Sequence, residues 1–266
     1  MSLKPRRRAL LVTGMHRSGT SCVTRIANLS GLAIGSDLLP AQDDNPLGFW
    51  EHAGLSAINN DILVACGTSW DGLAPLPDGW TDRPDVAEYK QALREVIERD
   101  FAEESELVIK DPRLCLLVPI WREILMELGY EPEFLIVVRD LPAVVASLSR
   151  RNHFPPWHSE LLWLRYNLMA EYHTREDRRA LVHYEDIVRD WRSTFGKVVG
   201  SIPLSLPDPG SEASDAIDEF VTPDLDHSPV TDPDRPVEMS PWSRIVSDAF
   251  AREGALDDAS ARDALD

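Results

Sequence analysis

The sequence predicts a single α/β domain with a mainly parallel central sheet that is flanked by helices. Three observations predict this class. Four short apolar runs have the length of buried strands, and they lie at residues 9–13, 107–109, 134–138 and 180–183. Segments with helical periodicity separate these runs, and strands that alternate with helices form parallel sheets. The 266 residues, 43% of them hydrophobic, suffice for one sizeable core, and no internal repeat marks a second domain within 1–266.

The first half of the chain begins with a strand over 9–13 and a turn over 14–20. Apolar residues recur at helical spacing between residues 18 and 30, so we expect a helix there. Five prolines interrupt residues 35–85, which should be loop-rich around one helix near 53–65. The other elements expected in this half are an exposed helix over 85–104, the strand at 107–109, and a helix from Pro112 to about Leu128.

The clearest strand of the second half is Phe134–Val138, with the sequence FLIVV, and it ends at Arg139. Pro142 stands where a first-turn proline is tolerated, so a helix should run from there to about Arg150. The remaining elements expected here are a helix over 159–174, the strand at 180–183 and a helix over 187–199.

Residues 203–240 differ in composition from the rest of the chain. Between Asp208 and Asp234 there are nine acidic residues and no Lys or Arg, and prolines are frequent throughout. We therefore expect a long acidic loop that is partly ordered at best. Ser240 and Pro241 then offer an N-cap and a first-turn proline for a C-terminal helix from about Trp242.

Charge and cysteine content exclude several classes of function. The net charge is −18, so we expect neither nucleic acid nor an anionic membrane as a partner. The three cysteines form no CxxC pair, which indicates no disulfide framework and a reducing, cytoplasmic location. The apolar stretch near the N-terminus, residues 9–12, is too short for a signal peptide, and no stretch approaches the length of a membrane span. The sequence does not indicate an oligomeric state.

A glycine-containing loop follows the first strand and opens the first helix. Its sequence, GMHRSGTS from Gly14 to Ser21, aims backbone N–H groups and the positive helix end at an anion. The two glycines have P-loop spacing, but Thr20 stands where an NTPase has its lysine. Arg17 supplies the positive charge instead, and three residues add hydroxyl donors: Ser18, Thr20 and Ser21.

This loop resembles the 5′-phosphosulfate loop of PAPS-dependent sulfotransferases (PAPS is 3′-phosphoadenosine-5′-phosphosulfate). The HRSGTS wording is most similar to the tyrosylprotein and carbohydrate branches of that family. The resemblance implies a P-loop-like sulfotransferase fold and PAPS as the donor. The residues that would bind its 5′ end are Arg17, Ser18, Gly19, Thr20 and Ser21.

A second anion site is predicted after the third apolar run. Arg139 follows the strand at the edge where open α/β sheets bind ligands. Ser147 lies on the next helix, and Arg151 shares its helix face if the helix continues that far. Arg and Ser on neighbouring elements make a good clamp for a terminal phosphate. In the sulfotransferase family an Arg and a Ser with this spacing bind the 3′-phosphate of PAPS.

Two further segments resemble the tyrosylprotein branch. Lys110 begins the KDPR segment that follows the strand at 107–109. The matching lysine of that branch stabilises charge on the transferring group, so the resemblance assigns this role to Lys110, together with Arg17. Tyr184, in LVHYED, matches a tyrosine that contacts the nucleotide.

A base must remove the proton of the acceptor hydroxyl as the new bond forms. The segment DDNPLGFWEH, residues 43–52, resembles the NPxGFWE stretch of bacterial relatives. In the carbohydrate and tyrosylprotein branches a Glu after the first helix is the base, and this likeness selects Glu51. Asp111 and His52 remain alternatives. The histidines show no metal-ligand spacing, and we expect no metal.

The sequence thus predicts a sulfotransferase that moves a sulfuryl group from PAPS to a hydroxyl acceptor, such as a sugar, a natural product or a tyrosine. Adenosine 3′,5′-bisphosphate would be the product of the donor. Two alternatives stay open: a P-loop kinase that acts on a small molecule, and a nucleotide-binding module without activity. The prediction requires that the loop around Arg17 and the site around Arg139 hold opposite ends of one nucleotide.

Overall fold

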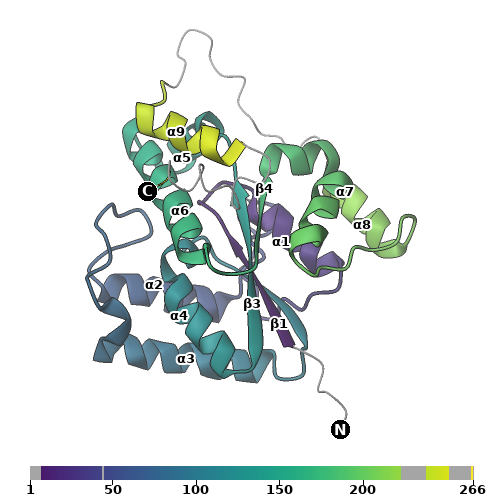
Figure 1. The fold of residues 1–266 in the computed structure, drawn as a ribbon, viewed down its shortest axis with the longest axis horizontal. Coiled ribbons are helices and arrows are strands. Elements are labelled where there is room, and N and C mark those ends of the chain that lie inside the picture. The colour runs from purple at the N-terminus through teal and green to yellow at the C-terminus, as the bar shows by residue number, and fades with distance from the viewer. Residues whose placement is uncertain (1–6, 44, 223–237, 252–264, 266) are drawn as a thin grey trace.

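The computed structural model describes residues 7–43, 45–222, 238–251 and 265. Within these ranges four parallel strands form one sheet in the order β2-β1-β3-β4 (Figure 1). The strands are β1 (Arg7–Thr13), β2 (Glu106–Lys110), β3 (Tyr130–Val138) and β4 (Arg179–His183). The register pairs Leu11 of β1 with Ile109 of β2 and with Phe134 of β3. The predicted single α/β domain with a parallel sheet is confirmed.

The strand order creates a switch point between β1 and β3. From β1 the chain continues to β2 at one edge of the sheet, and from β3 it continues to β4 at the opposite edge. The loops that follow β1 and β3 therefore diverge, and open α/β sheets bind their ligands in the crevice between such loops. Both predicted anion sites, the loop from Gly14 and the site at Arg139, follow these two strands.

Helices cover both faces of the sheet (Figure 1). One face packs against α2 (Ala53–Ala65), α3 (Pro84–Asp100), α4 (Leu114–Glu127), α5 (Leu141–Asn152), α6 (Pro156–Thr174) and α9 (Pro241–Ala251). The other face packs against α1 (Thr20–Leu29), α7 (Tyr184–Ser201) and α8 (Glu212–Phe220). A short 3₁₀ turn at Trp80–Asp82 contributes Trp80 to the core of the first face. Because side chains alternate along a strand, Leu11 enters the first core and Leu10 the second.

One predicted element is wrong in part. The long loop expected over 203–240 contains α8, whose Ile217 is buried in the second core. Ser211 caps this helix by accepting a hydrogen bond from the N–H of Ser214. Asp218 accepts hydrogen bonds from Trp191 and Arg192 of α7, so part of the acidic charge is paired with that helix. Residues 223–237 of the expected loop lie outside the described residues.

Helix boundaries elsewhere shift by a few residues. The most consequential shift is at α5, which continues to Asn152 and so carries both Ser147 and Arg151. Over the described ranges, no helix combines the length and the apolar character that a membrane crossing requires.

Candidate active site

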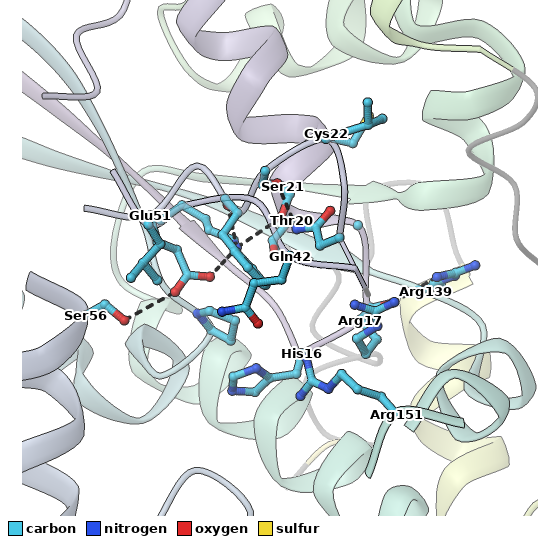
Figure 2. Close-up of a pocket in the computed structure, with 18 of the residues that line it drawn as sticks. His16, Arg17, Thr20, Ser21, Cys22, Gln42, Glu51, Ser56, Arg139 and Arg151 are labelled. Atoms are coloured by element: carbon cyan, nitrogen blue, oxygen red, sulfur yellow. Dashed lines mark hydrogen bonds and ion pairs between the residues drawn. The ribbon is translucent and has the colours of Figure 1, made fainter. Parts of the chain in front are cut away.

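A cavity of about 460 Å³ opens at the carboxyl ends of β1 and β3 (Figure 2). Three parts of the chain supply most of its wall: the β1–α1 loop, the segment of residues 39–51 and the residues that follow β2 and β3. Its size suits a nucleotide-sized ligand. A Glu–Lys pair lies at one end and a group of arginines at the other, with His16 between them.

The β1–α1 loop approaches its neighbours so closely that two of its positions require glycine. A Cβ on Gly14 would lie 2.4 Å from the carbonyl oxygen of Val137 in β3. Gly19 has a φ of +82°, and a Cβ there would lie 2.0 Å from the ring of Tyr184. The loop therefore holds the start of α1 against β3 and the start of α7, with Gly19, Thr20 and Ser21 on the cavity wall. The first N–H groups of a helix lack partners within the helix, so this end suits an anion.

Of the five residues predicted to bind the 5′ end of the donor, Ser18 alone does not line the cavity. Its side chain is fully buried, and its N–H donates to the carbonyl oxygen of Met15 at 3.1 Å. The sequence pattern alone could not separate Ser18 from its neighbours, because all three hydroxyls of the loop fit the same motif.

Glu51 and Lys110 form a buried ion pair at one end of the cavity. Lys110 Nζ lies 2.5 Å from Glu51 Oε1, and both side chains are over nine-tenths buried. Lys110 also donates to Ser21 Oγ at 3.2 Å and to the carbonyl oxygen of Phe49 at 3.0 Å. The ammonium group therefore touches both the start of α1 and the predicted base.

The environment of Glu51 makes it a stronger base than an exposed carboxylate. Burial raises the pKa of Glu51 above its ordinary value, and the charge of Asp111 acts in the same direction, against the opposing effect of Lys110. Its second oxygen, Oε2, is 3.4 Å from Ser56 Oγ. A carboxylate with a raised pKa takes up a proton more readily, as a general base must.

The two alternative bases have structural roles instead. His52 caps α2 by accepting from the N–H of Leu55, and its Nε2 lies 2.9 Å from Asp100 Oδ2. Asp111 is 2% exposed and binds Arg113 and the side-chain amide of Asn59. Neither His52 nor Asp111 lines the cavity. Of the three carboxylate or imidazole candidates, the geometry therefore favours Glu51.

The other end of the cavity carries Arg139. Its guanidinium is buried, donates from Nη1 to the carbonyl oxygen of Arg17 at 3.0 Å, and lies 4.7 Å from the centre of the Tyr184 ring. Nε and Nη2 are enclosed and have no hydrogen-bond partner among the described residues. Buried donors normally have partners, and an orphaned buried guanidinium nitrogen is costly. A phosphate or another anion is the kind of ligand that such guanidinium donors bind most strongly.

Arg17 lies closer to this end than the sequence predicts. Its Nε donates to Ser147 Oγ at 2.8 Å, and its φ of +70° is unusual for a residue with a side chain. The loop around Arg17 and the site around Arg139 are therefore in direct contact rather than separated anchors. Ser147 itself does not line the cavity, whereas Arg151, one turn further along α5, does. Figure 2 shows Arg17, Arg139 and Arg151 on the same side of the cavity.

An aromatic wall lies between the two ends. The His16 ring centre is 4.4 Å from that of Trp70, and the Arg151 guanidinium lies 5.4 Å above Trp70. Three contacts to α6 fix the Trp70 loop through its backbone: Tyr166 to the carbonyl of Trp70, His158 to that of Asp71 and Arg165 to that of Gly72. Burial and nearby cations hold the pKa of His16 well below its ordinary value, so His16 is neutral at pH 7.

The structure therefore brings most predicted site residues to one cavity. On its wall are Glu51, Lys110, Arg17, Gly19, Thr20, Ser21, Arg139, Arg151 and Tyr184. Sequence reasoning missed several wall residues, among them Ser56, Trp70, Arg113 and Phe220. Arg113 could have been predicted as a site residue, because it directly follows the Lys-Asp-Pro segment. Phe220 could not have been predicted as a site residue, because it lies at the end of α8, where the sequence indicated a loop. In the described part of the chain, no group of three His, Cys, Asp or Glu residues is placed to hold a metal ion.

Comparisons with known proteins place this fold. It is similar to a sulfotransferase domain of the Synechococcus PCC 7002 olefin synthase, with a TM-score of 0.54 and 18% identity over 95% of this chain and 98% of that one. A sulfotransferase domain from the curacin biosynthetic pathway is similar with a TM-score of 0.52 and 14% identity, over 93% of this chain and 98% of that one. A sulfotransferase from Mycobacterium tuberculosis H37Rv is similar with a TM-score of 0.52 and 16% identity, over 80% of this chain and 71% of that one.

No protein family model matches this sequence, and no curated protein matches it. The three structural likenesses confirm the P-loop-like sulfotransferase fold that the sequence resemblance implied.

Proposed function

We propose that this protein is a sulfotransferase that moves a sulfuryl group from PAPS to a hydroxyl of an acceptor. The acceptor oxygen attacks sulfur, and the bond between sulfur and the oxygen of the 5′-phosphate breaks. The electron pair of that bond stays on the phosphate, so adenosine 3′,5′-bisphosphate leaves. The proton of the acceptor hydroxyl passes to the Glu51 carboxylate.

The cavity offers matched positions for both ends of this donor. The start of α1, with Lys110 beside Ser21, suits the 5′-phosphosulfate. The Arg139 guanidinium, with Arg17 in contact, suits the 3′-phosphate, because charge-assisted bonds from arginine to phosphate are strong and directional. Tyr184 and Phe220 on the wall offer ring surfaces for the purine.

The reacting end provides the two kinds of group that the chemistry needs. Glu51 is the base, and its raised pKa suits that role. Lys110 holds a positive charge where negative charge develops on the sulfuryl and bridging oxygens. Because Lys110 contacts Glu51 directly, protonation of Glu51 during the reaction releases the ammonium to the departing phosphate.

One observation carries the proposal: Arg139, whose buried guanidinium has two nitrogens without a hydrogen-bond partner among the described residues, lines the same cavity as the start of α1. A donor that bears phosphate groups at both ends explains this arrangement. The substrate of an NTPase does not require a second phosphate site of this kind. An NTPase loop also has a lysine after its second glycine, and this chain has Thr20 at that position.

The test combines binding and turnover. Calorimetry should detect adenosine 3′,5′-bisphosphate binding without added metal, and weaker binding of ATP with Mg²⁺. Radiolabelled PAPS with a panel of hydroxyl acceptors should then yield labelled sulfate esters. Failure to bind the bisphosphate, together with no transfer to any acceptor, would contradict the proposal, and normal binding without any turnover would favour a binding module.

A further inference from the structure

A chain of buried hydrogen bonds connects the first core with the reacting end of the cavity. Trp121, on α4, donates from Nε1 to the side-chain oxygen of Asn59, on α2, at 2.9 Å. The side-chain amide of Asn59 donates in turn to Asp111 Oδ2 at 3.0 Å, and all three residues are at most 2% exposed. Because each of these buried groups is hydrogen-bonded to the next, Asp111 is held in a fixed position between the two helices and the end of β2.

Arg113 connects Asp111 to Ser56. Nη1 of Arg113 lies 3.0 Å from Asp111 Oδ1 and 3.1 Å from Oδ2, and it donates to Ser56 Oγ at 3.3 Å. This nitrogen bears two hydrogens, so one serves the carboxylate and the other the hydroxyl. Because Ser56 Oγ accepts from Arg113, its own hydrogen is available to Glu51 Oε2, 3.4 Å away (Figure 2). Catalytic hydrogen bonds are often this long before substrate binds.

Glu51 therefore has a different partner at each oxygen. Lys110 Nζ lies 2.5 Å from Oε1, and Ser56 donates to Oε2. In the proposed reaction Lys110 turns to the departing phosphate, and Oε1 then loses its partner. A base must stay within hydrogen-bond reach of the proton that it removes, and a small displacement costs much of the rate. The contact at Oε2 meets this need, because it does not depend on Lys110.

Given the proposed sulfotransferase function, on which this step rests, we infer that Ser56 and Arg113 are positioning residues for the base. Ser56 holds Oε2 of Glu51, so that Oε1 faces the acceptor hydroxyl once Lys110 has turned away. The proton of the acceptor then passes to Oε1, and Arg113 keeps the Ser56 hydroxyl directed at Oε2. Lys110 thus serves the departing phosphate, whereas Ser56 and Arg113 serve the base.

Removing the Ser56 hydroxyl tests this role. With the best acceptor of the panel, Ser56→Ala should lower kcat at least roughly fivefold. The bisphosphate Kd should change less than threefold, which also shows that the variant is folded. The pH midpoint of the rate should rise by at least about half a unit, because a hydrogen bond to the ionised carboxylate keeps its pKa down. The charged side chains that act most strongly on Glu51 are Lys110, Asp111 and Arg113, and this variant retains all three.

A double-mutant cycle separates this role from a merely structural one. In the Glu51→Gln background, Ser56→Ala should change the residual rate less than twofold, because the base that it positions is gone. Ser159→Ala is the matched control. Ser159 is a fully buried helix serine outside the cavity wall, and its hydroxyl has no partner among the described residues. Its removal should change neither kcat nor the pH midpoint.

Arg113→Lys tests the connection to Asp111. Lysine keeps the charge but lacks the planar fork that joins Asp111 to Ser56, so kcat should fall at least roughly threefold and the bisphosphate Kd should change less than threefold. An unchanged kcat and pH midpoint in Ser56→Ala would overturn the inference. An equal loss of rate in both Glu51 backgrounds, or lost bisphosphate affinity in a folded Arg113→Lys protein, would also overturn it. Absence of bisphosphate binding and of transfer in the unmutated protein would instead contradict the proposed function, and this inference with it.

Discussion

Replacing Glu51 with Gln separates catalysis from donor binding. The substitution keeps the size of the side chain but removes both the base and the negative charge beside Lys110. General-base catalysis contributes about 10² to 10⁴-fold to a rate, so kcat should fall by that range. The bisphosphate should bind as tightly as before or more tightly, because Lys110 no longer has a carboxylate partner in the empty cavity.

The same variant should be less stable when no ligand is bound. Removing one partner of a buried ion pair leaves the other charge uncompensated, at a cost of up to about 3–5 kcal/mol. Lys110 retains Ser21 Oγ and the carbonyl of Phe49, and the new amide oxygen can still accept, so we expect about 1–3 kcal/mol. Saturating bisphosphate should therefore raise the melting temperature of the variant more than that of the unmutated protein.

The assays are PAPS turnover with the best acceptor of the panel, calorimetry with the bisphosphate, and thermal melting with and without it. Glu88→Gln is the matched control, because Glu88 is exposed and lies away from the cavity. In the unmutated protein the rate should fall on acidification, with a midpoint above the ordinary carboxyl pKa, since the base must be deprotonated and burial raises the pKa of Glu51. Turnover by Glu51→Gln within threefold of the unmutated rate would refute the assignment of the base.

Two further predictions concern the loop and the fold. Gly19→Ala should destabilise the protein by more than the 1–2 kcal/mol expected from its positive φ alone, because the new Cβ would lie 2.0 Å from Tyr184. Gly67→Ala, with a φ of +76° and open space around it, measures that backbone cost by itself, and equal losses in urea unfolding would dismiss the Tyr184 contact. Burial lowers the pKa of His173 to about 4, so the fold favours its neutral form and stability should decline as the pH falls below about 6.5. Between pH 7.5 and 5.5 the loss is about 1.3 kcal/mol, and an identical loss in His173→Asn would show that another group causes it.

The sequence predicted the sheet well because its strands are short, buried apolar runs that tolerate few other structures. Phe134–Val138 shows this clearly, since every residue of that run is buried. The acidic segment was predicted less well. Its prolines and charges indicated a loop, while the helix within it depends on partners distant in sequence, such as Arg192 for Asp218.

In the candidate site, too, local sequence patterns could be predicted, whereas contacts between distant residues could not. Glycines, Arg17 and Arg139 could be predicted because each follows a strand at the edge where ligands bind. The direct contact between Arg17 and Ser147 could not, because it depends on the side-chain direction of a residue in an unusual backbone conformation. The sequence favoured Glu51 but kept His52 as an alternative base, and the contacts of His52 with Leu55 and Asp100 show that it supports α2.

The central claim is that one cavity grips both ends of a nucleotide that carries a 3′-phosphate. Calorimetry with adenosine 3′,5′-bisphosphate and adenosine 5′-monophosphate, on the unmutated protein and on Arg139→Ala, tests it most directly. The bisphosphate should bind the unmutated protein more tightly, and Arg139→Ala should weaken it by about 1.5–3 kcal/mol while leaving the monophosphate nearly unchanged. Arg150→Gln, an exposed charge change on α5, the helix that follows Arg139, should alter neither affinity. Equal affinities for the two nucleotides, or a bisphosphate affinity that survives loss of Arg139, would contradict the claim.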